Sequence, residues 1–352
     1  MKERLRQFKE LLMYFYLLHG RLEKINFLLY ALFSLLPRRI KSLPILLKIQ
    51  YNLLPFISFK ITQCRKLKNN KSKVRIGWVA DHFYPDYLGG AEITDFLMIK
   101  AGVKKGYEII KLDRDSVSDL RNLLDLDFLV VSNVHTFRPK EILNILLQRY
   151  VLYLHDTTVD NNILMLMKNA ELVIFLSPLH RKFFEKRFRL TSRVLIIPPP
   201  IEVHKYYQSE KEEFAIYAGL IAKHKGIYNI IRYARQNPSL KIILVGRKIE
   251  RDLSFPANVE YLGEIPQHRL IDLLSRAKYF IHLPEWVEAF GRAVAEAYLC
   301  GCKLITNEKV GFLSYPWNFQ DKEAVRRELC AAETRFWNVV TSILGFNRKS
   351  LH

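Results

Sequence analysis

The chain has 352 residues, of which 49% are hydrophobic, with 22 Phe and 18 Tyr. This length exceeds one ordinary core and this composition excludes a mainly disordered chain, so two domains and an extension are expected. The net charge of +20 is uneven, because residues 1–75 hold 17 Lys or Arg against three Glu, a net of +14. A basic segment therefore precedes a body of nearly ordinary charge.

Residues 1–72 form the basic extension, and their apolar residues recur at helical spacing. The apolar stretch 25–36 has 12 residues, whereas a membrane span needs about 20. Basic helices with a Leu- and Phe-rich face are typical of segments that lie in the membrane interface, drawn by anionic lipid. We therefore expect an amphipathic helical extension that holds the chain on the cytoplasmic, inner face of the cell membrane.

Two alternatives remain for this extension. The first is a helical subdomain that packs on the body or on a second subunit. The second is a nucleic-acid-binding tail, which the dense Leu and Phe disfavour, since a phosphate-binding arm is mostly basic and soluble. Nucleic acid is therefore not the expected partner.

From residue 73 onward, short apolar runs alternate with helix-length amphipathic stretches, which is the pattern of parallel βαβ units and an α/β fold. The proline run 198–200 stops any regular element and predicts a hinge between two such halves. Two open sheets facing each other would form a cleft at the carboxyl ends of their strands. The predicted strands are 74–80, 108–112, 128–133, 151–155, 172–177 and 194–198, followed by 214–219, 241–246, 259–262, 279–283 and 302–306.

A strand is expected to run into a loop at residues 78–92, where Gly89 and Gly90 open a helix. Backbone without Cβ can approach a ligand closely, and a helix N-terminus offers free N–H groups to an anion. A plain turn explains such a pair equally well. The pair is not the GxGxxG dinucleotide fingerprint, which argues against a dehydrogenase.

The stronger signal is the segment 284–301, with the sequence PEWVEAFGRAVAEAYLCG. Glu288 follows a predicted strand and is expected where a helix begins, and Glu296 lies eight residues further on. Two carboxylates at this spacing arise often by chance. A strand, Glu-Ala-Phe-Gly, a helix and Cys-Gly-Cys in this order are far less common, so the segment singles out both carboxylates.

This segment resembles the Glu-x(7)-Glu region of retaining glycosyltransferases of the GT-B fold, specifically glycosyltransferase family 4, or glycosyl transferases group 1. The similarity covers about residues 74–345. The family's other motifs are resembled by GGAE at 89–92, YLHD at 153–156, IPPPIE at 197–202, YAGLIAKHKG at 217–226 and ETRFWNVV at 333–340.

The resemblance implies two Rossmann-like domains that face a central cleft. Residues 73–200 would form the acceptor-side domain and residues 201–330 the nucleotide-sugar-binding domain. Residues 331–352 would form a C-terminal helix that packs back on the first domain. The implied activity is a retaining, metal-independent transfer of a sugar from a nucleotide-sugar to a lipid-linked, glycolipid or polysaccharide acceptor, without a cofactor.

The resemblance also implies roles for particular side chains. Lys225 would stabilise the leaving diphosphate, Glu288 would hold hydroxyls of the donor sugar, and His155 would approach that sugar near the reacting carbon. Glu296 would hold the ribose hydroxyls. The remaining expected donor-binding residues are Gly89, Gly90, Lys223, Arg247, Phe290 and Gly291.

The chain departs from the family pattern at Leu220, where the family usually has an arginine, and Lys223 or Arg247 is the expected source of the missing charge. Three of the named side chains also have a plain structural interpretation: Glu296 as a solvated helix residue, His155 as a core histidine and Lys225 as a surface turn residue.

Other functions have weaker support. A metal-dependent transferase needs Asp-x-Asp at the carboxyl end of a strand, but 125–127 precedes its strand and 113–115 lies outside the matched motifs. The four cysteines form no CxxC pair and have no histidines at zinc-ligand spacing, so no metal site is expected. The residues expected of a sugar-nucleotide epimerase are not evident. A non-catalytic membrane-anchored scaffold has only Leu220 in its favour, and a nucleic-acid-modifying glycosyltransferase only the basic extension.

Overall fold

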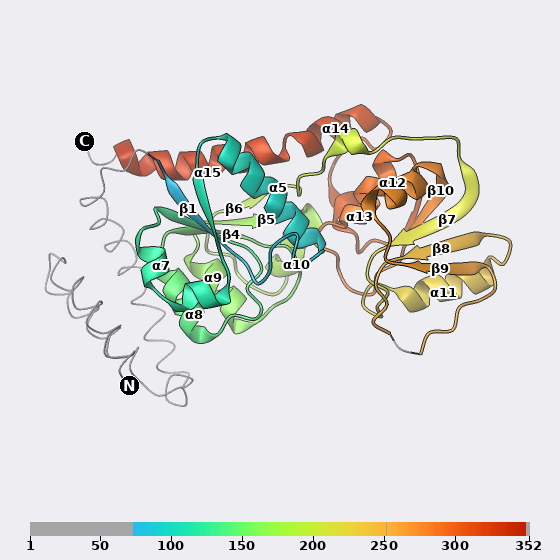
Figure 1. Ribbon diagram of the computed structural model, residues 1–352, viewed down its shortest axis with the longest axis horizontal. Helices are drawn as coiled ribbons and strands as arrows, with labels where there is room; N and C mark the ends of the chain where they lie inside the picture. Colours follow the sequence, from blue (N-terminus) through green and yellow to red (C-terminus); the bar gives the residue numbers. More distant parts are fainter. Residues whose placement is uncertain (1–72, 251, 350–352) are drawn as a thin grey trace, which may run out of the picture. The chain divides into compact units, whose positions relative to one another are not determined.

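The computed structural model describes residues 73–250 and 252–349, so the predictions for residues 1–72 lie outside the described residues. The chain divides into two compact units that interleave along the sequence. Of the described residues, the first unit contains 73–154, 158–173 and 190–194, and the second contains 155–157, 174–189 and 195–349. The secondary structure is α/β, with one sheet of six strands and one of five, as predicted (Figure 1).

The first sheet has the strand order β2-β1-β3-β4-β5-β6, so the direction of the order reverses between β1 and β3. Its strands are β1 (Arg75–Val79), β2 (Glu108–Leu112), β3 (Phe128–Val131), β4 (Tyr150–Tyr153), β5 (Leu172–Phe175) and β6 (Val194–Ile196). Strand β1 pairs in parallel with both β2 and β3. All residues of β3, β4 and β5 are buried, which explains why these strands appear in the sequence as unbroken apolar runs.

The helices that connect these strands begin at residues suited to that position. Asp160 accepts a hydrogen bond from the backbone of Ile163, and Ser177 from that of His180, so each side chain caps a helix. The helices are α5 (Gly90–Lys104), α6 (Arg114–Ser118), α7 (Arg121–Leu124), α8 (Pro139–Leu146), α9 (Asn161–Asn169) and α10 (Pro178–Glu185).

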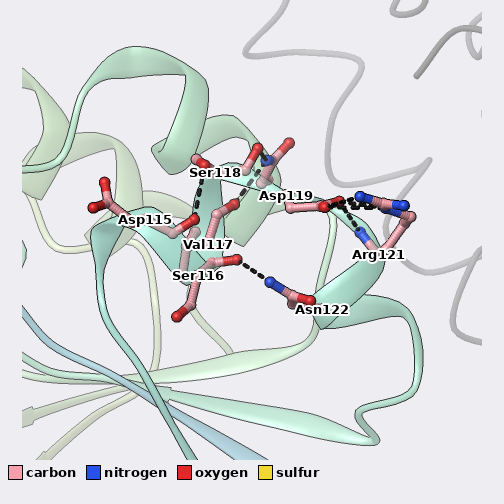
Figure 2. A network of polar contacts seen from close by, with 8 residues as sticks. Asp115, Ser116, Val117, Ser118, Asp119, Arg121 and Asn122 are labelled. Atoms are coloured by element: carbon pink, nitrogen blue, oxygen red, sulfur yellow. Dashed lines mark hydrogen bonds and ion pairs between the residues drawn. The ribbon is translucent and has the colours of Figure 1, made fainter. Parts of the chain in front are cut away.

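Figure 2 shows the corner between α6 and α7, where polar contacts join Ser118 to Asp115, Asn122 to Ser116 and Arg121 to Asp119. Just before this corner, the Asp113 carboxylate accepts a hydrogen bond of 2.8 Å from Ser116 N and caps α6. Hydrogen bonds from Ser116 lower the pKa of Asp113. The stretch 113–115 is therefore explained by helix capping.

The second sheet has the order β11-β10-β7-β8-β9, and all its neighbouring strands are parallel. Its strands are β7 (Glu212–Ala218), β8 (Lys241–Val245), β9 (Val259–Gly263), β10 (Ala277–His282) and β11 (Lys303–Thr306). The order reverses between β7 and β10, so the loops that follow these two strands leave the sheet side by side.

The helices of the second unit show the expected amphipathic pattern. In α11 the buried residues are Ile227, Ile230, Ile231 and Ala234, which is the spacing of one helix face. The remaining elements are η1 (Val203–Lys205), α11 (Ile227–Gln236), α12 (Gln267–Arg276), α13 (Arg292–Leu299), η2 (Gly311–Ser314), α14 (Lys322–Cys330) and α15 (Ala332–Lys349). None of the helices in the described ranges is long and apolar enough to cross a membrane.

The eleven strands predicted from the sequence are all present, and most end one or two residues earlier than predicted. The predicted strand 172–177 ends at Phe175, for example, because Leu176 and Ser177 already belong to the loop that leads to α10. The proline run 198–200 follows β6 and belongs to no regular element. The predicted domain boundaries and the packing of the C-terminal helix stay predictions.

Lys211 joins three elements of the second unit at one point. Its ammonium donates to the carbonyl oxygens of Ser275 at 2.8 Å, Ala277 at 2.9 Å and Cys300 at 2.7 Å. Ser275 and Cys300 lie at the carboxyl ends of α12 and α13, where carbonyls lack partners and carry partial negative charge. Burial lowers the pKa of Lys211. This lysine therefore caps two helices and fixes the start of β10.

We expect the substitution Lys211→Met to lower the free energy of unfolding by about 2–4 kcal/mol, because the carbonyl groups at the ends of α12 and α13 and at the start of β10 lose a charged donor. Urea denaturation followed by circular dichroism measures this change. The control is Lys278→Met, whose ammonium pairs with Glu213 at the surface and which should leave the midpoint unchanged. Equal effects of the two substitutions would contradict the capping role of Lys211.

Candidate functional site

The candidate site lies where the strand order of the second sheet reverses. In open α/β sheets, ligands bind beside such a point, outside the carboxyl ends of the strands. Residues 219–226 follow β7 and residues 283–291 follow β10, which are neighbouring strands. These two loops contain five of the residues predicted from the sequence: Lys223, Lys225, Glu288, Phe290 and Gly291.

An ion pair joins the two loops. Lys225 Nζ lies 2.8 Å from Glu288 Oε1, although the two residues are 63 positions apart in the sequence. The side chain of Glu288 is 15% exposed and that of Lys225 is 32% exposed. His282, the last residue of β10, places Nε2 at 3.6 Å from the same oxygen atom. Two nitrogen atoms thus converge on Glu288 Oε1.

The surroundings keep Glu288 ionised. Burial would raise the pKa of Glu288, but His282 and Lys225 lower it to about 2. Its second oxygen, Oε2, accepts no hydrogen bond from any side chain or backbone group in residues 73–250 and 252–349. The site therefore presents a charged carboxylate with one oxygen atom available to a hydroxyl donor, beside a partly exposed ammonium.

The turn that carries Lys225 depends on a glycine. Gly226 has a φ of 85° and caps the N-terminus of α11. A Cβ atom there would lie 1.8 Å from the carbonyl oxygen of Leu283, so only glycine allows the loop after β7 to approach the loop after β10. The backbone N–H of Glu285 also donates to the carbonyl oxygen of His224 at 3.1 Å. Lys225 is thus held against the loop that carries Glu288.

The prediction that Glu288 lies at the start of a helix is wrong. Helix α13 begins at Arg292, because Gly291 has a φ of 89° and turns the chain into the helix. Glu288 lies four residues earlier, in extended backbone that pairs with a neighbouring segment. Its N–H donates to Lys309 O at 2.8 Å, and its carbonyl accepts from Gly311 N at 3.1 Å.

Two hydroxyl groups hold the carbonyls on either side of Glu288. Thr157 Oγ1 donates to Val287 O at 3.1 Å, and Ser177 Oγ donates to Ala289 O at 2.6 Å. Both residues belong to the second unit by their contacts, although they follow β4 and β5 in the sequence. The backbone of Glu288 is therefore fixed from both sides.

His155 is half-buried in the short segment after β4. The carbonyl of the next residue, Asp156, accepts a hydrogen bond of 2.7 Å from His180 Nε2. Because His180 Nδ1 accepts from Leu176 N at 3.2 Å, the neutral ring carries its proton on Nε2. Burial lowers the pKa of His180 to about 4. His180 thus fixes the backbone beside His155, whose approach to a donor sugar stays a prediction.

Glu296 lies on α13 and is 15% exposed, so it is not a solvated helix residue. Arg292 Nη2 lies 3.5 Å from its Oε1 atom, and the Arg292 Nη1 atom donates to the carbonyl of Pro200 at 2.7 Å. Burial raises the pKa of Glu296, while Arg292 and a hydrogen bond from Tyr206 act in the opposite direction. The structure gives Glu296 its own partners, separate from the pair of Lys225 and Glu288.

Cationic side chains are available near Leu220, where the family usually has an arginine. Within the described part of the chain, the exposed side chains of Lys223 and Arg247 make no hydrogen bond or ion pair. The Arg247 carbonyl accepts from Ile221 N at 2.9 Å, which places the backbone of Arg247 beside the residue that follows Leu220. Lys223 and Arg247, which follow β7 and β8 in the sequence, therefore each carry a positive charge without a partner among the described residues.

The glycine pair and Phe290 occupy distinct places. Gly89 is the N-cap of α5, which begins at Gly90, as predicted; both belong to the first unit.

Phe290 is buried and packs edge-on against Phe312 and Tyr315. The side chain of Phe290 therefore packs in the core of the second unit, and its predicted contact with a donor stays a prediction.

Sequence reasoning missed His282. Its side chain is 7% exposed and its ring stacks on Tyr217, with ring centroids 5.8 Å apart. The signal was present, since a histidine is the second-last residue of the predicted strand 279–283, just before the Glu288 loop. Trp286 was also missed; it is 66% exposed, and its ring lies 5.3 Å from that of His224. No group of three or more His, Cys, Asp and Glu residues among those described could hold a metal ion.

Comparisons with known proteins give the family model that matches part of the chain and the solved structures that share its fold. Residues 201–319, about a third of the chain, match the family model described as glycosyl transferases group 1, and this stretch includes Lys225, Glu288 and His282. Among curated protein sequences, none matches the chain.

Solved glycosyltransferase structures share the fold at low sequence identity. Sucrose-phosphate synthase from Thermosynechococcus elongatus has a TM-score of 0.57 at 14% identity, over 79% of this chain and 99% of that one. AviGT4, a glycosyltransferase involved in avilamycin A biosynthesis, has a TM-score of 0.56 at 14% identity, over 77% and 98%. HepE from Anabaena, in complex with UDP and glucose, has a TM-score of 0.55 at 16% identity, over 79% and 99%. The fold is therefore that of the GT-B glycosyltransferases.

The buried ring of His180 predicts a pH dependence of stability. Because its pKa in the folded chain, about 4, lies below the unfolded value of 6.5, the unfolded chain binds more protons between these values. We expect stability to fall as the pH decreases from about 6.5 to 4, with His180 contributing about 3 kcal/mol. Urea denaturation between pH 4.5 and 7.5 measures the slope. A His180→Asn variant should show a shallower slope over this range, and an unchanged slope would contradict the assignment.

Proposed function

We propose that the chain is a retaining glycosyltransferase that transfers a sugar from a nucleotide-sugar donor without a metal ion. One observation carries the proposal: the pair of Lys225 and Glu288 stands at the reversal point of the second sheet, and Glu288 keeps one oxygen atom without a partner among the described residues. The family match over residues 201–319 supports the reaction class. Structures of HepE in complex with UDP and with UDP-glucose support the class of donor.

The chemistry of the site suits this reaction. When a sugar–phosphate bond breaks, negative charge gathers on the diphosphate and positive character on the anomeric carbon. The ammonium of Lys225 would stabilise the departing diphosphate, as a fixed cation stabilises developing negative charge in a partly buried site. Lys223 or Arg247 would add charge in place of the arginine replaced by Leu220.

The carboxylate would bind the donor sugar. Glu288 Oε2 would accept hydrogen bonds from sugar hydroxyls, while Oε1 stays with Lys225. Glu296 would hold the ribose hydroxyls, and His155 would lie near the reacting carbon. For retention of configuration, a donor phosphate oxygen would accept the proton of the acceptor, so we assign no protein group as general base.

We expect Glu288→Gln to lower kcat/KM by roughly 10- to 100-fold, because the sugar hydroxyls lose a charged acceptor. The matched control is Glu285→Gln on the same loop, which should stay within about twofold of wild type. Transfer or slow hydrolysis of a nucleotide-sugar, followed by release of the nucleoside diphosphate, gives the rates. Survival of activity in Glu288→Gln would show that another group binds the sugar.

A thermal-shift assay with nucleotide-sugars and nucleoside diphosphates in metal-free buffer identifies the donor, because a bound ligand raises the melting temperature of the chain. A ligand at a hundredfold excess over its Kd stabilises the chain by about 2.7 kcal/mol. Stabilisation by one nucleotide series supports the donor site. A folded chain that responds to none of them would favour the non-catalytic scaffold instead.

We infer the class of acceptor from the charge of the basic extension, residues 1–72. With 15 Lys or Arg in residues 1–72, the extension would hold the chain on anionic lipid at the cytoplasmic face of the membrane, so that it meets a lipid-linked or glycolipid acceptor. The support is the sequence alone, because residues 1–72 lie outside the described residues.

Vesicle binding tests this part of the proposal. Replacing Lys2, Arg4, Arg6 and Lys9 by Gln in the full chain should lower partition onto anionic vesicles by roughly two to three orders of magnitude, at about 1 kcal/mol per charge. Neutral phosphatidylcholine vesicles are the control and should bind both proteins weakly. Equal binding of the two proteins to anionic vesicles, or salt-sensitive binding to DNA instead, would refute the membrane role.

A further inference from the structure

We propose that His282 is a positioning residue of this site, which takes up a proton when an anionic ligand engages Lys225 and thereby keeps the Glu288 carboxylate charged and in place. The inference rests on the proposed function in one respect, since it takes Lys225 to contact the diphosphate of a donor. It adds a residue and a proton to the function proposed above.

The first support is the arrangement of the two nitrogen atoms around Glu288 Oε1. Lys225 Nζ lies at 2.8 Å and His282 Nε2 at 3.6 Å from this atom. The distance of 3.6 Å is too long for an ordinary hydrogen bond but short enough for strong electrostatic coupling. Lys225 is 32% exposed and can reach a ligand, whereas the side chain of His282 is 7% exposed.

The second support is the other ring nitrogen. His282 Nδ1 is buried and has no hydrogen-bond partner among the described residues. A buried polar atom without a partner destabilises the folded chain, and an apolar side chain at this place in the strand would avoid that cost. Packing alone therefore does not favour a histidine at this place, whereas the position of Nε2 beside the Glu288 carboxylate does, and this interaction has to offset the cost of the unpartnered Nδ1.

Among the contacts of the His282 ring in the described residues, the charged group is Glu288, which is itself paired with Lys225. Tyr217 stacks on the ring from β7, and burial followed by the charge of Glu288 raises the pKa of Tyr217, so this phenol stays neutral. On β11 the residue in register with His282 is Thr306, which carries no charge. The loop after β7 also carries a histidine, His224, one residue before Lys225, and burial lowers the pKa of His224.

Binding of an anion to Lys225 leaves the negative charge of Glu288 less well compensated. When a diphosphate shares the ammonium of Lys225, Glu288 keeps its negative charge in a site where it is only 15% exposed. A poorly compensated carboxylate in such a site is strongly unfavourable, so protonation of His282 becomes favourable. The proton comes from solvent and stays on the imidazole, and no bond of the ligand breaks. Because binding takes up a proton, affinity falls as the pH rises, by at most about tenfold per pH unit.

Calorimetry of the full chain with UDP tests the proton uptake. Titrations near pH 7.5 in buffers of different ionisation enthalpy give the number of protons exchanged on binding. We expect the wild type to take up more protons than His282→Asn, with a difference of up to one proton. The control His268→Asn, at an exposed histidine on α12, should take up as many protons as the wild type. Equal uptake by the wild type and His282→Asn would overturn the inference.

The same titrations distinguish a failure of the proposed function from a failure of the inference about His282. If UDP does not bind, GDP and ADP are the further probes. A folded chain that binds none of the three would overturn the donor site and this inference together. Binding with a proton uptake that does not depend on His282 would overturn the inference alone.

A second measurement needs no ligand and keeps His282 in place. In a His224→Asn background, Lys225→Met removes the ammonium from Glu288, much as a bound anion would draw it away. His224 is removed first because the charge of Lys225 also lowers its pKa. One of the remaining imidazoles should then titrate at a higher pH than in His224→Asn alone. Nitrogen-15 NMR of the histidine rings measures this shift. The matched control Lys223→Met, in the same background, removes an exposed lysine two residues away and should leave the titration unchanged. Unchanged titration of every remaining imidazole on Lys225→Met in this background would overturn the inference.

Discussion

The ion pair between Lys225 and Glu288 is the contact on which the arrangement of the site depends. It joins the loops after β7 and β10, and the parallel sheet brings these loops together only because its strand order reverses between them. A partly buried pair is stable when both partners are present, and removal of one leaves an uncompensated charge. The glycine at position 226 and the backbone bonds of Glu288 to residues 309 and 311 keep the partners at this distance.

The fold and several site residues could be predicted from the sequence because their signals are local. Strands such as β3 and β5 are unbroken apolar runs, since both faces of a parallel sheet are covered. Gly89 and Gly90 stand where a loop enters a helix, and α5 does begin at Gly90. Lys225 and Glu288 were singled out by motifs that follow strands, and both lie in loops at the carboxyl ends of strands.

Other features could not be predicted because they depend on contacts between distant segments. The spacing of Glu288 and Glu296 does not reveal that Gly291 adopts a left-handed conformation and delays the helix to Arg292. A histidine at the end of an apolar strand resembles a core residue, so His282 was missed until the structure placed it beside Glu288. The hydroxyls of Thr157 and Ser177 act on a loop more than a hundred residues away, which no local pattern records.

Those two hydroxyls also indicate which segments of this chain have to be inherited together. Thr157 and Ser177 lie outside residues 201–319, the stretch that matches the family model, yet they hold the carbonyls that flank Glu288. A gene fusion at the proline run 198–200 would keep Lys225 and Glu288 and leave Val287 and Ala289 without these donors. Exchange of carboxy-terminal halves between relatives would therefore join the Glu288 loop to foreign supports, and selection would act on the two segments together.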